Sequence, residues 1–340
     1  MTNYILKDES ASYYECGFSC DSQIFIRLGN EAFYITDGRY TIEAKEALKD
    51  AEVIEADTNL LKSANSLLKD TKIKEILYDP KEWSVYEFEK LKDNLNIKFT
   101  PKENFLQIKR IIKTDKEIEL LKKAVKLGAD RFEQYAKRLT TLLDKDERYL
   151  YFEAYDILST HGENQISFEP IIALDQNSAK PHAHPTSHRL KEDSFILFDA
   201  GVKYQRYCSD RTRCTSFNPN LNFEKKQYFK NKKKQKIYDI VLKAQEEAIK
   251  AIRPGIKAKE IDKIARDVIE NAGYGKYFVH STGHGVGLDI HEEPYISKTS
   301  ETLIDENMIF TIEPGIYLEG EFGVRIEDMV RVTKDGVEVL

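Results

Sequence analysis

The stretch His280-Ser-Thr-Gly-His-Gly-Val-Gly-Leu-Asp-Ile-His291 contains three histidines and three glycines. Glycine is unfavourable in a helix interior, so glycines at positions 283, 285 and 287 argue against a stable helix here. The segment is expected to be a closely packed strand or loop that presents imidazole rings. All seven histidines of the chain lie between His161 and His291, so the chemistry is expected in the second part of the chain.

Carboxylates accompany three other apolar, strand-like runs. Asp199 ends one such run, and Asp210 follows eleven residues later. That spacing suits a hairpin that places the two aspartates side by side. Glu313 and Glu327 each lie in or at the end of another apolar run.

Four carboxylates and one imidazole can converge in a buried site only if cations compensate their charge. Two divalent metals about 3.5–4 Å apart would supply that charge and would lower the pKa of a water held between them. Carboxylate bridges suit Mn²⁺, Co²⁺, Fe²⁺ or Zn²⁺, and the imidazole argues against a purely oxygen-ligated Ca²⁺ site. Any one of these carboxylates alone would usually be a turn or surface residue. All five residues in apolar-flanked contexts favour a metal centre.

Composition narrows the class of protein. The chain has 340 residues, 41% of them hydrophobic and 32% charged, with a net charge of -6. This balance gives no general attraction to nucleic acid or to anionic lipid. No run of about 18 apolar residues predicts a membrane span, and the N-terminus lacks an apolar signal core, so a cytoplasmic location is expected. The four cysteines form no CxxC pair and are expected to be reduced.

Periodicity predicts two domains. The first hundred residues alternate strand and helix signals. Strands are expected at 22–28 and 31–36, joined by a Gly29-Asn30 hairpin turn. Further strands are expected at 53–54, 73–77 and 97–99, and helices near 40–48, 60–68 and 85–91. Residues 101–113 read as the link to a second domain. That domain begins with a capping box, Thr114-Asp-Lys-Glu117, and contains helices near 148–160, 237–252 and 259–271.

One basic run, Lys225–Lys236, could contact phosphates. We interpret it instead as a solvated loop followed by a helix start, because the chain as a whole is acidic.

Five motifs carry a family resemblance. They are Asp-Ala-Gly (199–201), Ser-Asp-x-Thr-Arg (209–213), His-x-x-Gly-His-Gly-Val-Gly-Leu-Asp-Ile-His-Glu-x-Pro (280–294), Thr-Ile-Glu-Pro-Gly-Ile-Tyr (311–317) and Gly-Val-Arg-Ile-Glu-Asp (323–328). In order and spacing they resemble the proline-specific pita-bread metallopeptidases, which include the Xaa-Pro aminopeptidases and the prolidases. The resemblance is strong from about residue 114 to 340. The first domain resembles the family's creatinase-like N-terminal domain in length and pattern, without a sharp motif.

The resemblance implies an α+β fold, in which a pita-bread catalytic domain (114–340) follows a smaller α/β creatinase-like domain (1–110). It also implies a set of metal ligands, Asp199, Asp210, His284, Glu313 and Glu327. By analogy Asp210 and Glu327 would bridge two divalent metal ions, with Mn²⁺ as the first choice. Asp199 would complete the coordination of one ion, and His284 and Glu313 that of the other.

Further roles follow from the same resemblance. Glu313 would also shuttle a proton for the attacking water. His182, His280 and His291 would act on the substrate, Arg325 would orient ligands or bond near the substrate, and Tyr317 would offer a hydroxyl. Three other histidines match nothing in the family and are interpreted as loop or helix-end residues: His161, His184 and His188.

The implied activity is release of an N-terminal residue from a peptide whose second residue is proline. The alternative is a prolidase, which accepts only Xaa-Pro dipeptides. A metal-free binding protein or a creatinase-like hydrolase on the same fold is a more remote alternative, because all five ligand positions are intact. Methionine aminopeptidase is disfavoured, because it usually lacks the N-terminal domain and because the His291-Glu-x-Pro294 ending is more typical of the proline-specific relatives. A homodimer or higher homo-oligomer is expected.

Overall fold

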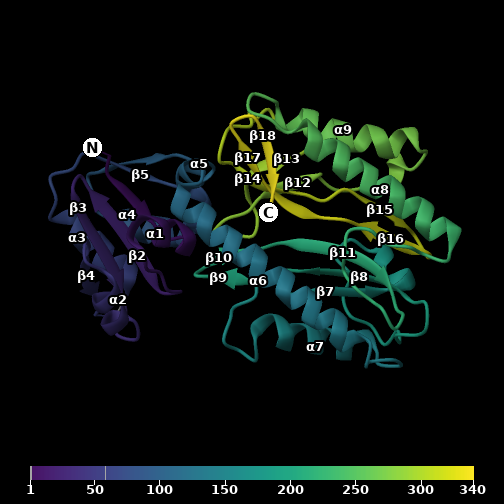
Figure 1. Ribbon diagram of the computed structural model, residues 1–340. Helices are drawn as coiled ribbons and strands as arrows, with labels where there is room; N and C mark the ends of the chain where they lie inside the picture. Colours follow the sequence, from purple (N-terminus) through teal and green to yellow (C-terminus); the bar gives the residue numbers. More distant parts are fainter. Residues whose placement is uncertain (1, 58) are drawn as a thin grey trace. The chain divides into compact units, whose positions relative to one another are not determined.

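The computed structural model describes residues 2–57 and 59–340 and divides the chain into two units (Figure 1). The first unit ends at Lys109, and the second is Arg110–Leu340. The segment 101–113, interpreted as a link, contains the short helix α5 (Phe105–Arg110). In the described part of the chain, no helix is both long enough and apolar enough to span a lipid bilayer.

The first unit is built on a mixed six-stranded sheet in the order β4-β3-β2-β1-β5-β6. Its strands are β1 (Tyr4–Leu6), β2 (Gln23–Leu28), β3 (Glu31–Thr36), β4 (Glu52–Glu55), β5 (Glu75–Tyr78) and β6 (Lys98–Pro101). β2 and β3 form the predicted hairpin, and Gly29 has a φ of 61° in its turn, a value that suits glycine. β4, β5 and β6 each run parallel to a neighbour.

Helices cover both faces of this sheet. They are α1 (Glu9–Cys16), α2 (Thr41–Ala47), α3 (Leu60–Lys69) and α4 (Val85–Lys92), with α5 and a single turn, η1 (Pro80–Glu82), completing the unit. Because strand side chains alternate between faces, Leu6 belongs to the apolar core under α1, α2 and α5, whereas Ile5 belongs to the core under α3 and α4.

The second unit contains the same arrangement twice: two long helices that pack on an antiparallel sheet. The first pair is α6 (Asp115–Leu139) and α7 (Glu147–Ser159), and its three-stranded sheet contains β7 (Ile171–Leu174), β8 (Phe195–Ala200) and β11 (Arg211–Ser216). The second pair is α8 (Lys232–Ala251) and α9 (Ala258–Asn271), and its five-stranded sheet contains β12 (Gly283–Gly285), β13 (Glu292–Ile296), β14 (Ile309–Ile312), β17 (Asp328–Thr333) and β18 (Gly336–Val339).

Two small hairpins and two short 3₁₀ turns complete this unit. The hairpins are β9 (Lys203–Tyr204) with β10 (Tyr207–Cys208), and β15 (Gly315–Leu318) with β16 (Phe322–Arg325); the turns are η2 (Asp175–Ala179) and η3 (Gly275–Tyr277). In Figure 1, α6 and α7 lie against the first sheet and the green α8 and α9 against the second. The predicted α+β fold is confirmed.

Helix ends follow the expected capping chemistry. Thr114 and Glu117 form the predicted capping box at the start of α6. α7 ends at Ser159, and the next residue, Thr160, takes the left-handed conformation that often closes a helix. α8 begins at Lys232, five residues before the predicted start, because the Asn231 side chain accepts hydrogen bonds from the first-turn amides.

Candidate metal centre and active site

The five expected ligands come from separate segments of the second unit. Asp199 lies in β8, and Asp210 immediately precedes β11. These strands pair antiparallel, with Thr212 opposite Asp199, so the hairpin brings the two aspartates to the same end of the sheet. The other ligands lie in or beside the second sheet: His284 in β12, Glu313 directly after β14 and Glu327 directly before β17.

Two glycines allow the close packing that holds His284. A Cβ on Gly283 would lie 1.9 Å from the backbone oxygen of Thr311, and one on Gly285 would lie 2.2 Å from that of Glu293. β12 can therefore approach β13 and β14 only because both positions lack a side chain. The backbone N–H of His284 also donates to Thr311 Oγ1 at 3.1 Å.

The hydrogen bond of the His284 ring sets its tautomer. Nδ1 lies 3.1 Å from the carbonyl oxygen of Gly285, which can only accept, so Nδ1 carries the proton. Nε2 then presents a lone pair to Asp210 Oδ2 at 3.6 Å and to Glu313 Oε1 at 3.4 Å. A lone pair that faces two carboxyl oxygens is stable only if a proton or a cation lies between them.

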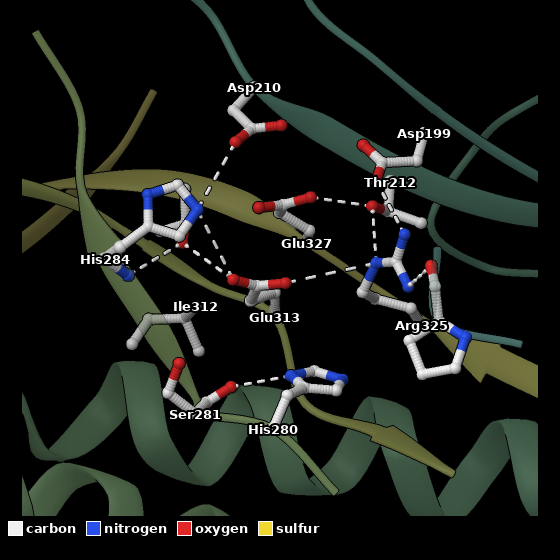
Figure 2. Close-up of polar contacts among 12 residues, drawn as sticks. Asp199, Asp210, Thr212, His280, Ser281, His284, Ile312, Glu313, Arg325 and Glu327 are labelled. Carbon is white, nitrogen blue, oxygen red and sulfur yellow. Dashed lines mark hydrogen bonds and ion pairs between the residues drawn. The ribbon is translucent and has the colours of Figure 1, made fainter. Parts of the chain in front are cut away.

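The other carboxylates turn toward the same centre (Figure 2). One ligand atom from each of Asp210, His284 and Glu327 lies within 4.8 Å of the others. In the described part of the chain, Asp199 Oδ1 is buried without a hydrogen-bond partner. A buried carboxylate oxygen without a partner is costly, and a cation at this position would satisfy it.

Electrostatics support the same conclusion. Burial raises the pKa of Asp210 well above its ordinary range, and the carboxylates of Glu327, Asp199 and Glu313 raise it further. Burial likewise raises the pKa of Glu327, with Glu313 and Asp199 adding to the effect. Burial raises the pKa of Glu313 to about 7 against the opposing effect of Arg325. The donor set thus fits divalent cations, which would compensate this excess of negative charge.

Arg325 is the cation that approaches this cluster from the protein side, and all three of its nitrogens donate. Nη2 bonds Asp199 Oδ2 at 2.6 Å, Nε bonds Thr212 Oγ1 at 3.1 Å, and Nη1 bonds the Tyr317 hydroxyl at 2.8 Å. Nη1 also reaches the carbonyl oxygen of Pro181. Thr212 in turn donates to Glu327 Oε2 at 2.6 Å. Arg325 and Thr212 therefore orient two of the candidate ligands.

His280 belongs to a hydrogen-bond chain with Tyr317. Its Nδ1 lies 2.7 Å from the carbonyl oxygen of Ser281, so Nδ1 donates and Nε2 accepts from the Tyr317 hydroxyl at 2.8 Å. Burial and the nearby Arg325 lower the pKa of His280 to about 4, so the ring is neutral at physiological pH. The Tyr317 hydroxyl thus connects the His280 ring to Arg325.

His291 and His182 line the same cleft, which has a volume of about 490 Å³. The His291 ring packs edge-on against His284 at 4.3 Å between ring centroids. Partial burial and His182 lower the pKa of His291. Apolar side chains on the wall of this cleft include Phe168, Ile171, Val279 and Tyr295. The cleft thus has an apolar wall beside the carboxylate cluster.

The remaining histidines lie outside the cluster. His161 follows the end of α7 and pairs with Asp156, and His188 lies 3.3 Å from Asp175. His184 is exposed in the loop after η2.

Two sets of residues around the site were not predicted as site residues. Thr212 was detectable, because it is the Thr of the Ser-Asp-x-Thr-Arg motif. Arg110 and Lys113 could not be predicted as site residues from the sequence. Both contact the carboxylate of Glu292, which lies about 180 residues further along the chain. They fall in the segment interpreted as a link.

Family models match both units of the chain. The model of metallopeptidase family M24 matches residues 119–334, and that of the creatinase/prolidase N-terminal domain matches residues 2–115. Among curated relatives, an uncharacterized peptidase of Staphylococcus epidermidis is 43% identical over 231 residues, and one of Staphylococcus aureus is 42% identical over 234 residues. Each alignment covers 68% of this chain and 62% of the relative, so the chain spans less than two thirds of these relatives' length.

Similar solved structures cover nearly all of the chain. The X-Pro aminopeptidase of Thermotoga maritima has a TM-score of 0.88 at 30% identity and covers 100% of this chain and 95% of its own. The Xaa-Pro dipeptidase of Bacillus anthracis has a TM-score of 0.89 at 30% identity, with coverage of 99% and 92%. The prolidase of Pyrococcus furiosus has a TM-score of 0.86 at 33% identity, with coverage of 100% and 96%.

Proposed function

The chain belongs to metallopeptidase family M24, in its proline-specific pita-bread group, and from this premise we propose that it is a Xaa-Pro aminopeptidase. It would hydrolyse the bond between an N-terminal residue and a following proline. The substrate is a peptide that continues beyond that proline.

The proposed metal ligands are the five that converge in the second unit: Asp199, Asp210, His284, Glu313 and Glu327. Four carboxylates with one imidazole suit two divalent ions of the Mn²⁺, Co²⁺, Fe²⁺ or Zn²⁺ type, and Mn²⁺ is the first choice among them. When bound, such a pair supplies positive charge to the cluster and lowers the pKa of a water between the ions. The His284 tautomer supports this assignment, because it leaves the Nε2 lone pair facing the centre.

The proposed chemistry of the chain's own residues begins with Glu313. Glu313 lines the cleft beside His284, so its carboxylate is placed to take up and release a proton. Glu313 would accept a proton from water as the water oxygen bonds the scissile carbonyl carbon. It would return that proton to the proline nitrogen as the C–N bond breaks. His182, His280 and His291 line the cleft and would contact the peptide, with the Tyr317 hydroxyl holding the His280 ring and Arg325 holding that hydroxyl.

One observation favours an aminopeptidase over a dipeptidase. A dipeptidase must bind the free carboxylate of its Xaa-Pro substrate, and that task normally falls to Lys or Arg. Within the described residues, Arg325 is the only Lys or Arg that lines the cleft, and every one of its nitrogens already donates to protein oxygens. Among the residues that the structure describes, no Lys or Arg of the cleft is therefore left over for the terminal carboxylate.

The experiment compares three substrates that differ only after the proline: Xaa-Pro, Xaa-Pro-NH₂ and Xaa-Pro-Yaa. The aminopeptidase proposal expects the amide and the tripeptide to be cleaved at least about tenfold more efficiently than the free dipeptide, because they carry no carboxylate next to the cluster. Preference for the free dipeptide would establish the prolidase alternative instead. Metal analysis of the same protein, with near-zero divalent metal and no cleavage of any substrate, would indicate a metal-free binding protein.

A further inference from the structure

A buried cluster of charges lies beside the cleft and has no part in the chemistry above. The side chains of Arg110, Lys113 and Glu292 are only 2%, 1% and 2% exposed. Lys113 Nζ lies 2.6 Å from Glu292 Oε1, and Arg110 Nη2 lies 3.2 Å from Glu292 Oε2. Arg110 also pairs with Asp289, and Lys113 Nζ donates to the backbone oxygen of Arg110 at 2.6 Å.

Burial of this kind is not explained by stability alone. Two buried cations lose much of their hydration, and a well-packed apolar replacement of similar volume is often as stable as a buried ion pair. What such a network does provide is a fixed geometry, because each carboxylate oxygen has a defined partner. The part of the chain held in that geometry is the segment from Asp289 to Glu292.

That segment contains His291. Asp289 precedes His291 by two residues and Glu292 follows it directly, so the cations hold the backbone on both sides of the histidine. Residues 286–291 are neither helix nor strand, and regular structure resumes only at β13. The loop also closes over the Glu292 carboxylate, because a Cβ on Gly287 would lie 2.4 Å from Glu292 Oε1.

The His291 ring depends on this support more than its neighbours do. The rings of His280 and His284 each have a hydrogen bond to a backbone carbonyl, which fixes their orientation. In the described part of the chain, the His291 ring makes no hydrogen bond and is located by its backbone and by the edge contact with His284.

We propose that Arg110 and Lys113 are positioning residues for His291. Through Asp289 and Glu292 they hold the loop that presents its imidazole to the proline end of the peptide. This inference rests on the proposed function, in that His291 is taken to contact the substrate. Displacement of a catalytic group by about 1 Å can cost about 10²-fold in rate, so loss of the network is expected to reduce turnover on that scale.

The test is a double-mutant cycle on the metal-loaded, full-length protein. Lys113→Met is expected to lower kcat for a Xaa-Pro-Yaa peptide by about 10²-fold while both metals stay bound, and Lys113→Arg is expected to restore most of it. In a His291→Ala background, Lys113→Met is expected to change kcat by less than about threefold, because the group that it positions is gone. Lys116→Met, at an exposed position of α6, is the matched control.

Two outcomes would overturn the proposal. If Lys113→Met lowers kcat equally with and without His291, the network acts on the fold in general. If His280→Ala suppresses the Lys113 effect as completely as His291→Ala does, the network is not specific to His291. Should Lys113→Met fail to fold, Asp289→Asn replaces it, because Asp289 is 31% exposed and the change weakens its ion pair with Arg110.

A spectroscopic readout keeps this inference separate from the proposed function. Zn²⁺-loaded protein with ¹³C-labelled histidine gives one ring signal for each of seven histidines, and His291→Ala identifies that of His291. Lys113→Met or Asp289→Asn is expected to shift or broaden that signal and to leave the signal of exposed His161 unchanged. An unchanged His291 signal refutes positioning, even if the wild-type protein cleaves no Xaa-Pro peptide.

Discussion

Asp210 reaches the candidate metal centre from the end of the β8–β11 hairpin, 3.6 Å from His284 Nε2. Asp210→Asn keeps the size of the side chain but removes the charge on which a bridging ligand depends. We expect the variant to lose bound metal and turnover together, measured by elemental analysis and peptide cleavage on the same sample. Asp335→Asn, at an exposed turn, is the control. Full metal stoichiometry in Asp210→Asn would contradict the bridging role.

The hydrogen-bond chain from Arg325 through Tyr317 to His280 leads to a second expectation. Tyr317→Phe removes the hydroxyl between the other two groups, and His280→Ala removes its acceptor. Both variants are expected to keep two metals and to lose about 10²-fold in kcat, the scale expected when groups beside the reacting atoms are displaced by about 1 Å. The double variant is expected to be no worse than the single variants, because the groups act as one unit. Loss of metal in either variant would make these residues supports of the ligands instead.

At the scale of elements, the placement of His284 depends on how closely β12 approaches β14. Gly283→Ala would force a Cβ to within 1.9 Å of the Thr311 carbonyl oxygen, and a backbone oxygen cannot move aside cheaply. We expect the variant to lose about 1–3 kcal/mol or more of unfolding free energy in urea and to bind metal weakly. Gly336→Ala, where a Cβ meets no atom within 4 Å, is expected to be neutral. Equal stability of the two variants would show that β12 can shift.

The sequence predicted elements well where local chemistry defines them. The Thr114–Glu117 capping box and the Gly29-Asn30 turn both depend on neighbouring residues, and both are present. β1 was not predicted, because three residues carry too little periodicity to distinguish a strand. α1 was missed because its sequence is largely polar, although Asp8 caps its start and Gly17 closes its end.

The residues of the candidate site also fall into those that the sequence predicts and those that it does not. Its carboxylates and histidines were detectable because each lies in a short motif beside an apolar run. The partners of Glu292 were not detectable, because ion pairs between residues 179 and 182 positions apart leave no local pattern. The hydrogen bond between His280 and Tyr317 could not be predicted either, because these residues lie 37 positions apart and only the folded chain brings them together.

At the scale of the whole molecule, the candidate ligands come from both helix-and-sheet halves of the second unit. Asp199 and Asp210 belong to the half with α6 and α7, whereas His284, Glu313 and Glu327 belong to the half with α8 and α9. Cations that these residues share would therefore link the two halves of the second unit. Metal binding is then expected to stabilise the fold and not only to support the chemistry, since a ligand that binds only the native state shifts the unfolding equilibrium.

The pH dependence of that stabilisation follows from the carboxyl pKa values. Burial raises the pKa of Glu313 from 4.5 to about 7, and it raises the pKa of Asp210 and Glu327 well above their ordinary range. The metal-free folded chain therefore keeps protons on these carboxyls at pH values at which the unfolded chain has released them. Their contribution to stability is present at low pH and is lost as pH rises through these pKa values, because each carboxyl then ionises in a buried, negatively charged cluster. Bound cations remove that penalty, and they compete with protons for the same oxygens.

The increase in Tm on adding metal is therefore expected to grow between pH 5.5 and pH 8, measured as the difference between metal-loaded and chelator-treated protein at each pH. Taking the difference removes the pH dependence of groups elsewhere in the chain. Calorimetry in buffers of different ionisation enthalpy is expected to show proton release on binding near pH 6. Those protons come from the carboxyls, because burial lowers the pKa of His284 to about 4 and the ring is already neutral. A metal-induced change in Tm that is the same at pH 5.5 and pH 8, without proton release, would exclude the buried carboxyls as the metal ligands.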